Sequence, residues 1–345
     1  MPVAKLSSNN AANEKIGGPG STSLFSFLIF VVVGLAVVLP QPFSENEFLY
    51  GGGLARFSVA IIFFLQGLSL PTRSLINGYR PLRLHRFILF WNFIGFPVVT
   101  FLLFFPVARI VPTELLLGFA VLAFLPTTIA SATAYTALSD GCVANAIVAT
   151  ALSSLLAVFV VPAVSFIYFR MELSIDVPLS KVLLNLIYIL VIPLVMGQIA
   201  QRLFQCNMPG TAKISKKVSA GLILCIVYLA FVKSMNSGIF EKFSFISLAM
   251  TLFAVVLLLL VTSVFVWLSA FWMQFTMSQR IAAFYCGSQK SLAAGLPLVS
   301  SVLLSIPDLE NTAMIFIPLL FFHPLQMALA GIAASRLKSR SNVKG

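Results

Sequence analysis

Charged residues are scarce in this chain, and their scarcity excludes most classes of soluble protein. Only 9% of the 345 residues are charged, 59% are hydrophobic and the mean hydropathy is +1.02. A typical globular domain has about 25% charged and about 45–50% apolar residues. The apolar runs are long enough to cross a hydrocarbon layer of about 30 Å. The composition therefore predicts a polytopic membrane protein.

The alternating pattern of a transmembrane barrel is also missing. Barrel strands have about ten residues of alternating polarity, whereas the apolar runs here are longer and continuous. In a bilayer every backbone N–H and C=O must be bonded within the protein, which leaves helices as the other solution. We expect an all-α fold.

Motifs of catalysis and nucleotide hydrolysis are absent as well. The sequence has no HExxH, GxSxG, CxxC or P-loop motif. No two of the four cysteines have the spacing of a CxxC pair, so we interpret them as free cysteines that act as small buried apolar residues. We expect neither an enzyme nor an organic cofactor. Without a P-loop, transport through this chain would be passive or driven by an ion gradient.

Basic residues outnumber acidic ones and give a net charge of +12. They lie in short segments between apolar runs, a pattern that reflects membrane topology rather than nucleic-acid binding. Most of them fall in cytoplasmic segments if both termini are cytoplasmic. We therefore predict no nucleic-acid partner, and an integral protein of the plasma (inner) membrane with both termini in the cytoplasm.

Ten apolar spans are expected, separated by clusters of Pro, Gly and Asn. Their approximate limits are 23–40, 54–70, 86–106, 114–139, 142–169, 181–202, 214–234, 243–272, 278–305 and 312–336. Residues 1–22 are a polar tail, expected to be disordered and cytoplasmic, and 337–345 are a second cytoplasmic tail. We divide the rest into a first five-helix repeat at 23–169 and an inverted second repeat at 181–336, a common arrangement in secondary transporters.

The fourth span contains a proline followed by hydroxyl residues. Pro126 removes a backbone donor and precedes Thr127, Thr128 and Ser131. One interpretation is that these hydroxyls bond to carbonyls one turn back and only bend a continuous helix. The other is an unwound segment whose hydroxyls and free carbonyls bind an ion or substrate. Irregular backbone at membrane depth is tolerated where it is buried in protein or lines a cavity.

The ninth span is interrupted at CGSQKS, residues 286–291. Gly287 weakens the helix, and either Ser288 or Ser291 is placed to cap a new half-helix. Lys290 is the one charged side chain predicted to lie deep in a span. A charge at that depth costs several kcal/mol unless it faces a wet cavity or has a partner. The alternative is a Lys290 side chain that snorkels to the membrane surface.

Two further polar residues lie inside predicted spans. His323 precedes Pro324, so it is either a neutral side chain that bonds a carbonyl freed by the proline or part of a site. Asn92 is of the kind that commonly bonds between helices.

Four segments resemble the bile acid:sodium symporter superfamily, and more closely its divergent branch that includes the seventh human member of solute carrier family 10. They are FFLQGLSLPTRSL (63–75), RPLRLHRFILFWNFIGFPVVT (80–100), CGSQKSL (286–292) and IPLLFFHPLQ (317–326). The resemblance implies two inverted five-helix repeats, with spans 1, 2, 6 and 7 as a panel domain and spans 3–5 and 8–10 as a core domain. The broken fourth and ninth helices would cross near the membrane midplane. A small organic anion would bind beside this crossover and move by alternating access.

Carried over residue by residue, the resemblance places ligands at both breaks. Asn92, Ser131 and Gln289 match sodium-binding positions and would form a sodium site if one is present, and Thr150 matches a further hydroxyl ligand. The full set of expected substrate- or ion-binding residues is Asn92, Thr127, Thr128, Ser131, Thr150, Tyr285, Ser288, Gln289, Lys290, Ser291 and His323.

Two departures from the family bear on the coupling ion. Tyr285 stands where relatives have a glutamate that balances sodium, and Lys290 stands where they have an asparagine. Oxygen ligands are lost and a cation is gained, which puts sodium coupling in question. We predict that the Lys290 ammonium lies at or near the sodium region of the relatives, beside Gln289, the hydroxyls of Ser131 and Ser288, and main-chain carbonyls freed by the breaks. Sodium and the proton are the candidate coupling ions.

The expected function is a secondary transporter whose partners are a small organic anion and the lipid bilayer. The alternative is a non-transporting membrane protein that regulates ion homeostasis, calcium in particular, which the loss of ion ligands favours. Substitutions at the crossover separate the two, because Ser131→Ala should abolish transport but spare a regulator that acts through its surface.

Overall fold

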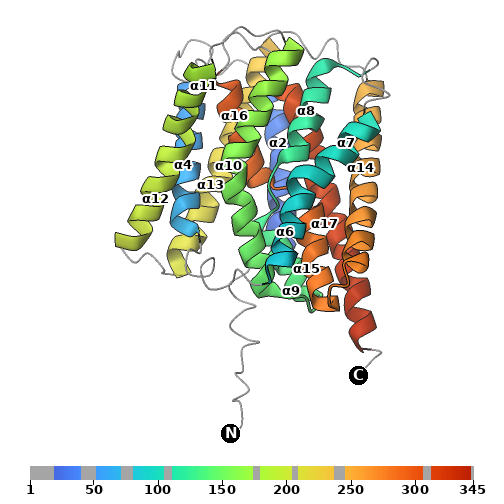
Figure 1. Ribbon diagram of the computed structural model, residues 1–345. Coiled ribbons are helices and arrows are strands. Elements are labelled where there is room, and N and C mark those ends of the chain that lie inside the picture. Colours follow the sequence, from blue (N-terminus) through green and yellow to red (C-terminus); the bar gives the residue numbers. More distant parts are fainter. Residues whose placement is uncertain are drawn as a thin grey trace.

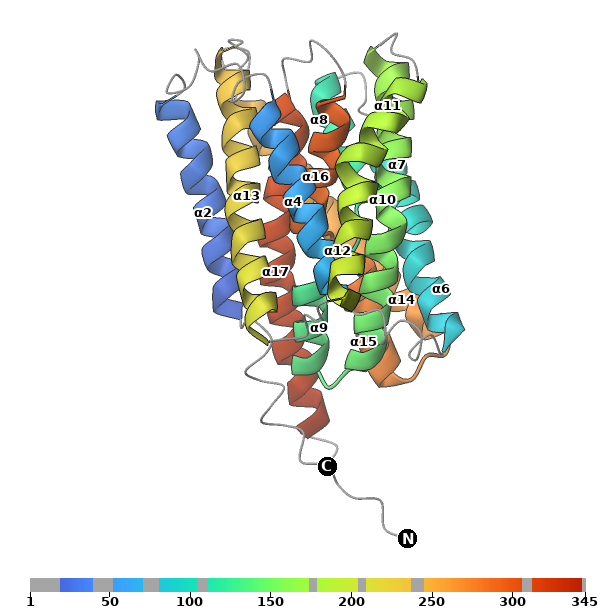
Figure 2. The ribbon, with the colours of Figure 1, turned by 90° about the vertical axis from the view of Figure 1, so that its left-hand side faces the viewer.

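The computed structural model describes residues 19–39, 52–70, 81–104, 111–173, 179–203, 209–236, 245–305 and 312–342. Within these ranges the chain forms helices and no strand, as the composition predicts. The long helices lie side by side and run along the height of the molecule (Figures 1 and 2). Most of the predicted N-terminal tail, residues 1–18, lies outside the described residues, and the first helix of the described part begins at Pro19.

The described residues contain sixteen helical elements. In chain order they are α2 (Pro19–Val38), α4 (Gly53–Ser69), α6 (Leu82–Phe90), the π-helix η1 (Trp91–Gly95), α7 (Phe96–Phe104), α8 (Thr113–Phe124), α9 (Ile129–Leu138), α10 (Val143–Leu173), α11 (Leu179–Leu186), the π-helix η3 (Ile187–Val191), α12 (Ile192–Leu203), α13 (Pro209–Asn236), α14 (Phe245–Trp272), α15 (Met277–Ser288), α16 (Leu292–Leu303) and α17 (Thr312–Asn342).

Six helices of the described part of the chain are long and apolar enough to cross a membrane by themselves. They are Leu82–Phe104, Val143–Tyr168, Leu184–Leu203, Ile214–Met235, Ile246–Trp272 and Ala313–Leu337. The pair α8 and α9 makes a seventh if its two helices, bent by 57°, count as one span. Leu24–Val38 and Gly53–Ser69 are apolar but shorter. The all-α membrane fold is therefore confirmed, and ten spans in two inverted repeats stay a prediction.

Two pairs of half-helices meet inside the molecule. The first break is Leu125–Thr128, between α8 and α9, and the second is Gln289–Ser291, between α15 and α16. In Figures 1 and 2, α8 and α16 occupy the upper half of the molecule, whereas α9 and α15 occupy the lower half. The two broken helices therefore pass through the molecule in opposite directions.

The second break begins later than the sequence suggested. Gly287 and Ser288 still belong to α15, so the expectation that Gly287 interrupts the helix is wrong. Close packing holds this turn, because a Cβ on Gly287 would lie 3.1 Å from the side chain of Val266 in α14. The glycine allows α15 to approach α14 rather than ending α15.

Two π-helical turns were not predicted, although the sequence carries a signal for both. Trp91–Gly95 ends two residues before Pro97, and Ile187–Val191 ends two residues before Pro193. A proline inside a helix has no N–H for the carbonyl four residues earlier, so the hydrogen-bond ladder has to shift there. Such π turns often occur at functional sites, and η1 lies beside the two breaks.

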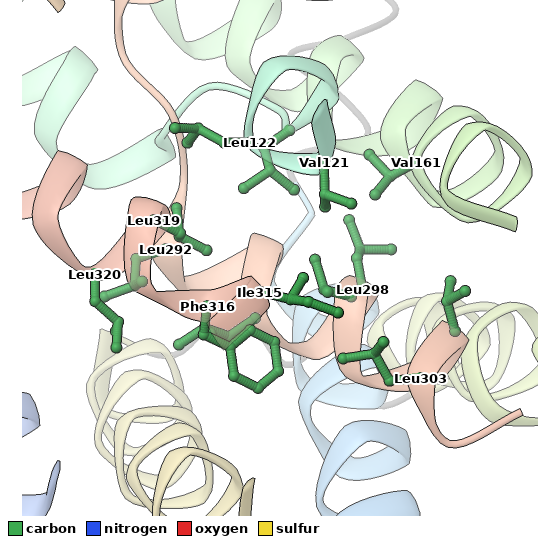
Figure 3. Packing of buried hydrophobic residues seen from close by; sticks show 14 of the residues in the cluster. Val121, Leu122, Val161, Leu292, Leu298, Leu303, Ile315, Phe316, Leu319 and Leu320 are labelled. Atoms are coloured by element: carbon green, nitrogen blue, oxygen red, sulfur yellow. The ribbon is translucent and has the colours of Figure 1, made fainter. Parts of the chain in front are cut away.

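An apolar core surrounds the upper half-helices. Side chains of α8, α10, α16 and α17 converge there, among them Leu122, Val161, Leu298 and Phe316 (Figure 3). Inside a membrane such contacts stabilise mainly through close packing, because lipid tails are as apolar as leucine. This packing fixes the positions of α8 and α16, and with them the ends of both breaks.

Candidate functional site at the helix crossover

The two breaks contact each other directly. The main-chain N–H of Ser291 in the second break donates to the carbonyl oxygen of Pro126 in the first, at 2.7 Å. The hydroxyl of Ser131, in the first turn of α9, donates to Oε1 of Gln289 at 3.0 Å. These side chains are buried. Residues far apart in the sequence thus form one polar crossover inside an apolar bundle.

A hydroxyl residue caps each half-helix that leaves the crossover. Thr128 Oγ1 accepts hydrogen bonds from the N–H groups of Ser131 and Ala132, at 3.2 and 3.3 Å. Ser291 Oγ accepts one from the N–H of Ala294 at 3.1 Å. Between the two candidate caps of the second break, Ser291 is therefore the cap. The hydroxyl of Ser288 instead donates to the carbonyl of Phe284, at 2.6 Å.

The first turns of α9 and α16 reach the protein surface. Ala130 and Ala293, the second residues of these helices, are both exposed although their neighbours in the breaks are buried. The N–H groups of a first turn have no partner within their own helix and carry the positive end of the helix dipole. Both half-helices therefore present such a positive end where the molecule is accessible.

The Lys290 side chain is fully buried within the crossover, with 0% of its surface exposed. Its Nζ donates to three main-chain carbonyl oxygens, those of Asn92 at 2.9 Å, Ala123 at 2.7 Å and Leu125 at 2.9 Å. It also lies 4.2 Å from the centre of the Phe96 ring. We call the three oxygens the carbonyl cage. An ammonium group has three donors, so all of them are used, and a snorkelling Lys290 is excluded.

Local structure explains why the two cage oxygens of the first break are free. In a continuous helix the N–H of Thr127 would bond the Ala123 carbonyl, but it donates instead to Ser153 Oγ at 3.2 Å. The corresponding donor for the Leu125 carbonyl is the N–H of Ile129, which begins α9 on the far side of the break. The interruption after Pro126 therefore frees both carbonyls for the ammonium.

The third cage oxygen is free because of the π turn. The N–H of Phe96 donates to the carbonyl of Trp91, five residues earlier, and so bypasses Asn92. In this register the next donor, five residues after Asn92, is Pro97, which has no N–H. The Asn92 carbonyl therefore takes its hydrogen bond from Lys290.

A glutamine of α17 holds the main chain of the second break. Gln326 accepts from the N–H of Lys290 with Oε1 and donates to the Lys290 carbonyl with Nε2, both at 2.7 Å. The same Nε2 lies 3.0 Å from Nδ1 of His323. His323 therefore joins the crossover through Gln326. Sequence reasoning missed Gln326, although it follows the selected His323 by three residues and so shares its helix face.

Ser153 of α10 supports the first break in a similar way. Its hydroxyl oxygen accepts from the N–H of Thr127 and from Nδ2 of Asn92, at 3.2 and 3.3 Å. The predicted ligand Thr150 lies one turn earlier, and its hydroxyl bonds the carbonyl of Ile147 at 3.0 Å. Among the described residues, the α10 hydroxyl that contacts a break is therefore that of Ser153.

Tyr285 is buried near the crossover but bonds away from it. Its hydroxyl lies 2.9 Å from Ser139 Oγ, at the end of α9, and its ring stacks on that of Tyr135 with 5.8 Å between centres. The site therefore has a neutral ring at the position where the resemblance leads one to expect a carboxylate. Lys290 bonds freed carbonyls, as expected, but not the expected hydroxyls of Ser131 and Ser288, because those hydroxyls donate to Gln289 and Phe284.

Three buried polar atoms around the crossover have no protein partner. They are Oδ1 of Asn92, Oγ1 of Thr127 and Nε2 of Gln289. Buried polar atoms are nearly always bonded, so such exceptions call for a bound water, ion or ligand. Oδ1 and Oγ1 would suit a small cation, but the Lys290 ammonium is bonded to the main chain of Asn92. Its charge disfavours a second cation at short range.

Comparison with known proteins gives a consistent result. The sequence model of the SBF-like CPA transporter family matches residues 23–339. Sodium/bile acid cotransporter 7 of Mus musculus is 29% identical over 323 residues, 91% of this chain and 92% of that protein. Sodium/bile acid cotransporter 7-A of Xenopus laevis is 27% identical over 319 residues, 89% and 91% of the two chains. An uncharacterised protein of Pseudomonas aeruginosa is 27% identical over 320 residues, 92% and 93%.

Proposed function

Because the chain belongs to the SBF-like CPA transporter family, we propose that it is a secondary transporter that carries a small organic anion across a membrane by alternating access. The observation that carries the proposal is the pair of half-helices α9 and α16. Both begin at the crossover, and both expose the second residue of their first turn. Two positive helix ends beside unpartnered buried polar atoms suit a carboxylate or sulfate group.

The proposed mechanism uses two groups of helices. A panel of α2, α4, α12 and α13 moves relative to a core that holds both broken helices, and the substrate binds between them. The close contact of α4 and α12 supports a rigid panel, because a Cβ on Gly67 or Gly197 would overlap a carbonyl of the facing helix. The opposite directions of the two broken helices support two inverted repeats, 23–169 and 181–336 (Figure 2).

The proposal includes transport that does not require sodium. The relatives are named as sodium cotransporters, but here the crossover already contains the Lys290 cation, and Tyr285 supplies no carboxylate. The protein would then exchange anions, or couple to protons. Both termini would be cytoplasmic, as the distribution of basic residues predicts.

Transport by the purified full chain in liposomes tests this proposal. Uptake of labelled taurocholate, a sulfated steroid and a short carboxylate would be compared in sodium and in choline buffers. We expect uptake of at least one anion at the same rate in both. Folded protein that moves none of these anions would contradict the proposal, and strict sodium dependence would contradict its ion-coupling part.

Variants at the second residue of each half-helix sharpen the test. Ala293→Glu places a negative charge beside the proposed anion site and should abolish uptake, whereas the neutral Ala293→Gln of similar size should retain more of it. Ala130→Glu and Ala130→Gln provide the same comparison at α9. Equal uptake by the charged and neutral variants at both positions would show that the substrate does not bind there.

A further inference from the structure

The carbonyl cage has the form of a cation site. One of its three oxygens comes from the η1 turn, and the other two come from the end of α8 and the first residue of the first break. All three lie within 2.7–2.9 Å of Lys290 Nζ. The face of the Phe96 ring lies on the same nitrogen, and aromatic faces attract cations. Main-chain carbonyl oxygens are also the ligands with which proteins bind desolvated monovalent cations.

The cage exists for reasons that do not involve the lysine side chain. Its oxygens lost their helical donors because Pro97 has no N–H, because Thr127 bonds Ser153, and because α9 starts at Ile129. A chain without Lys290 would still have the two prolines and Ser153. It would then hold three buried carbonyl oxygens with no donor, an unfavourable arrangement that a cation relieves.

We infer that the carbonyls of Asn92, Ala123 and Leu125 form a binding site for a monovalent cation, and that the ammonium of Lys290 occupies this site permanently. The lysine is a positioning residue that fastens the second break to the first break and to η1. The crossover therefore assembles without an ion from solution. Removal of the side chain leaves a vacant site that a free monovalent cation fills.

The geometry also predicts which cations bind best. The oxygens are spaced for an N–H donor at 2.7–2.9 Å, so ammonium fits directly. Methylammonium should bind as well, since its methyl group occupies space that the Lys290 chain leaves. Potassium is close to ammonium in size, whereas sodium prefers shorter distances to oxygen and should bind more weakly. The bulky N-methylglucamine should not enter.

The test measures thermal unfolding of the full chain in detergent, so it does not depend on the substrate or on the proposed transport. Lys290→Ala is prepared in N-methylglucamine chloride and titrated with ammonium, methylammonium, potassium or sodium chloride at constant ionic strength. The controls are the unmodified protein and Lys216→Ala, which removes an exposed lysine of α13. Lys290→Met, whose neutral side chain fills the same space, reports on the charge.

The expected result is a saturable rise of the unfolding midpoint of Lys290→Ala, by about 4 °C at a hundredfold excess over the dissociation constant. Ammonium and methylammonium should be the most effective cations. The unmodified protein, Lys216→Ala and Lys290→Met should show no such response. Phe96→Leu in the Lys290→Ala chain should lower the affinity for each cation severalfold, because the ring no longer faces it.

Two outcomes would overturn the inference. One is a Lys290→Ala chain that no cation stabilises more than N-methylglucamine does, whether that chain is recovered folded or not. The other is a Lys290→Met protein as stable as the unmodified one, because the three carbonyls would then need no cation. Recovery of folded Lys290→Ala only from cells lysed in ammonium or methylammonium would support the inference.

Discussion

The two helix breaks differ in their hydrogen-bonding chemistry. The first break contains a proline and, with the end of α8, supplies acceptors, namely the carbonyls of Ala123, Leu125 and Pro126. The second break supplies the matching donors, the ammonium of Lys290 and the N–H of Ser291. Each break alone would leave buried polar groups without partners. Together they satisfy one another, which explains how irregular backbone persists inside an apolar bundle.

The breaks also differ in what holds them from outside. A hydroxyl of α10, Ser153, accepts one N–H of the first break. A carboxamide of α17, Gln326, bonds both the N–H and the carbonyl of Lys290 in the second. The second break thus has more hydrogen bonds to the helices around it. It also contains Lys290, the one charged side chain among the described residues that bond at the crossover. Substitutions in the second break should therefore lower the free energy of unfolding more than substitutions in the first break.

The largest effect is expected for Lys290→Met, which turns the donor-rich break into a neutral one. Three buried carbonyls lose their donor, so the free energy of unfolding should fall by about 3–5 kcal/mol. Unfolding in detergent, followed with a thiol-reactive dye that reaches the buried Cys286 only on unfolding, measures the change. Lys216→Met is the control. A loss below about 1 kcal/mol would show that the carbonyls do not depend on the ammonium.

The second largest effect is expected for Gln326→Leu. This change removes two hydrogen bonds to the main chain of Lys290 and should cost about 2–3 kcal/mol, because the freed N–H and carbonyl stay buried. The same unfolding assay applies, with the neighbouring Leu325→Met as control. A double variant with Lys290→Met should lose less than the sum of the two single losses, since both act on one segment. Simple additivity would contradict this coupling.

The sequence predicts the fold class and the positions of both breaks, but much less of the contact chemistry. Long apolar runs specify helices, and Pro126 and the run at 286–291 mark the interruptions, although the second break occupies only Gln289–Ser291. Lys290 was identified because a charge is conspicuous in an apolar span. Freed carbonyls are expected beside it, but the sequence does not say which residues supply them, since a main-chain carbonyl has no letter of its own. Only the combination of a π turn with Pro97 shows that the Asn92 carbonyl is free.

Gly287 was predicted wrongly and Ser153 was not predicted at all, and in both cases the reason is a contact with another helix. Gly287 was expected to break the helix on propensity alone, but packing against Val266 keeps it helical. Ser153 was overlooked because a serine in an apolar helix usually bonds its own main chain. Such long-range partners depend on how α10 and α17 sit against the breaks, which no local pattern specifies. The panel, the core and the inverted repeats remain predictions.

A smaller effect is expected for Ser153→Ala at the first break. The N–H of Thr127 and Nδ2 of Asn92 both lose their acceptor, so the free energy of unfolding should fall by about 1–2 kcal/mol. The adjacent buried Ser154→Ala is the matched control. Thr127 N–H would then be free to bond the Ala123 carbonyl in competition with Lys290. A loss of stability as large as that of Gln326→Leu would contradict the expectation that the second break is the more sensitive of the two.

The smallest losses of stability are expected for substitutions of the two helix caps, Thr128 and Ser291, and the two losses should differ. Thr128 accepts two N–H groups of α9, whereas Ser291 accepts one of α16. Thr128→Val should therefore cost about 1 kcal/mol and Ser291→Ala about 0.5 kcal/mol, within the usual range for removing an N-terminal cap. Both losses are measured in the same unfolding assay.

Because Ser291 N–H bonds the Pro126 carbonyl, a loosened α16 also disturbs the first break. The combined variant should thus differ from the sum by more than about 0.5 kcal/mol, and strict additivity would mean that the two breaks are held independently.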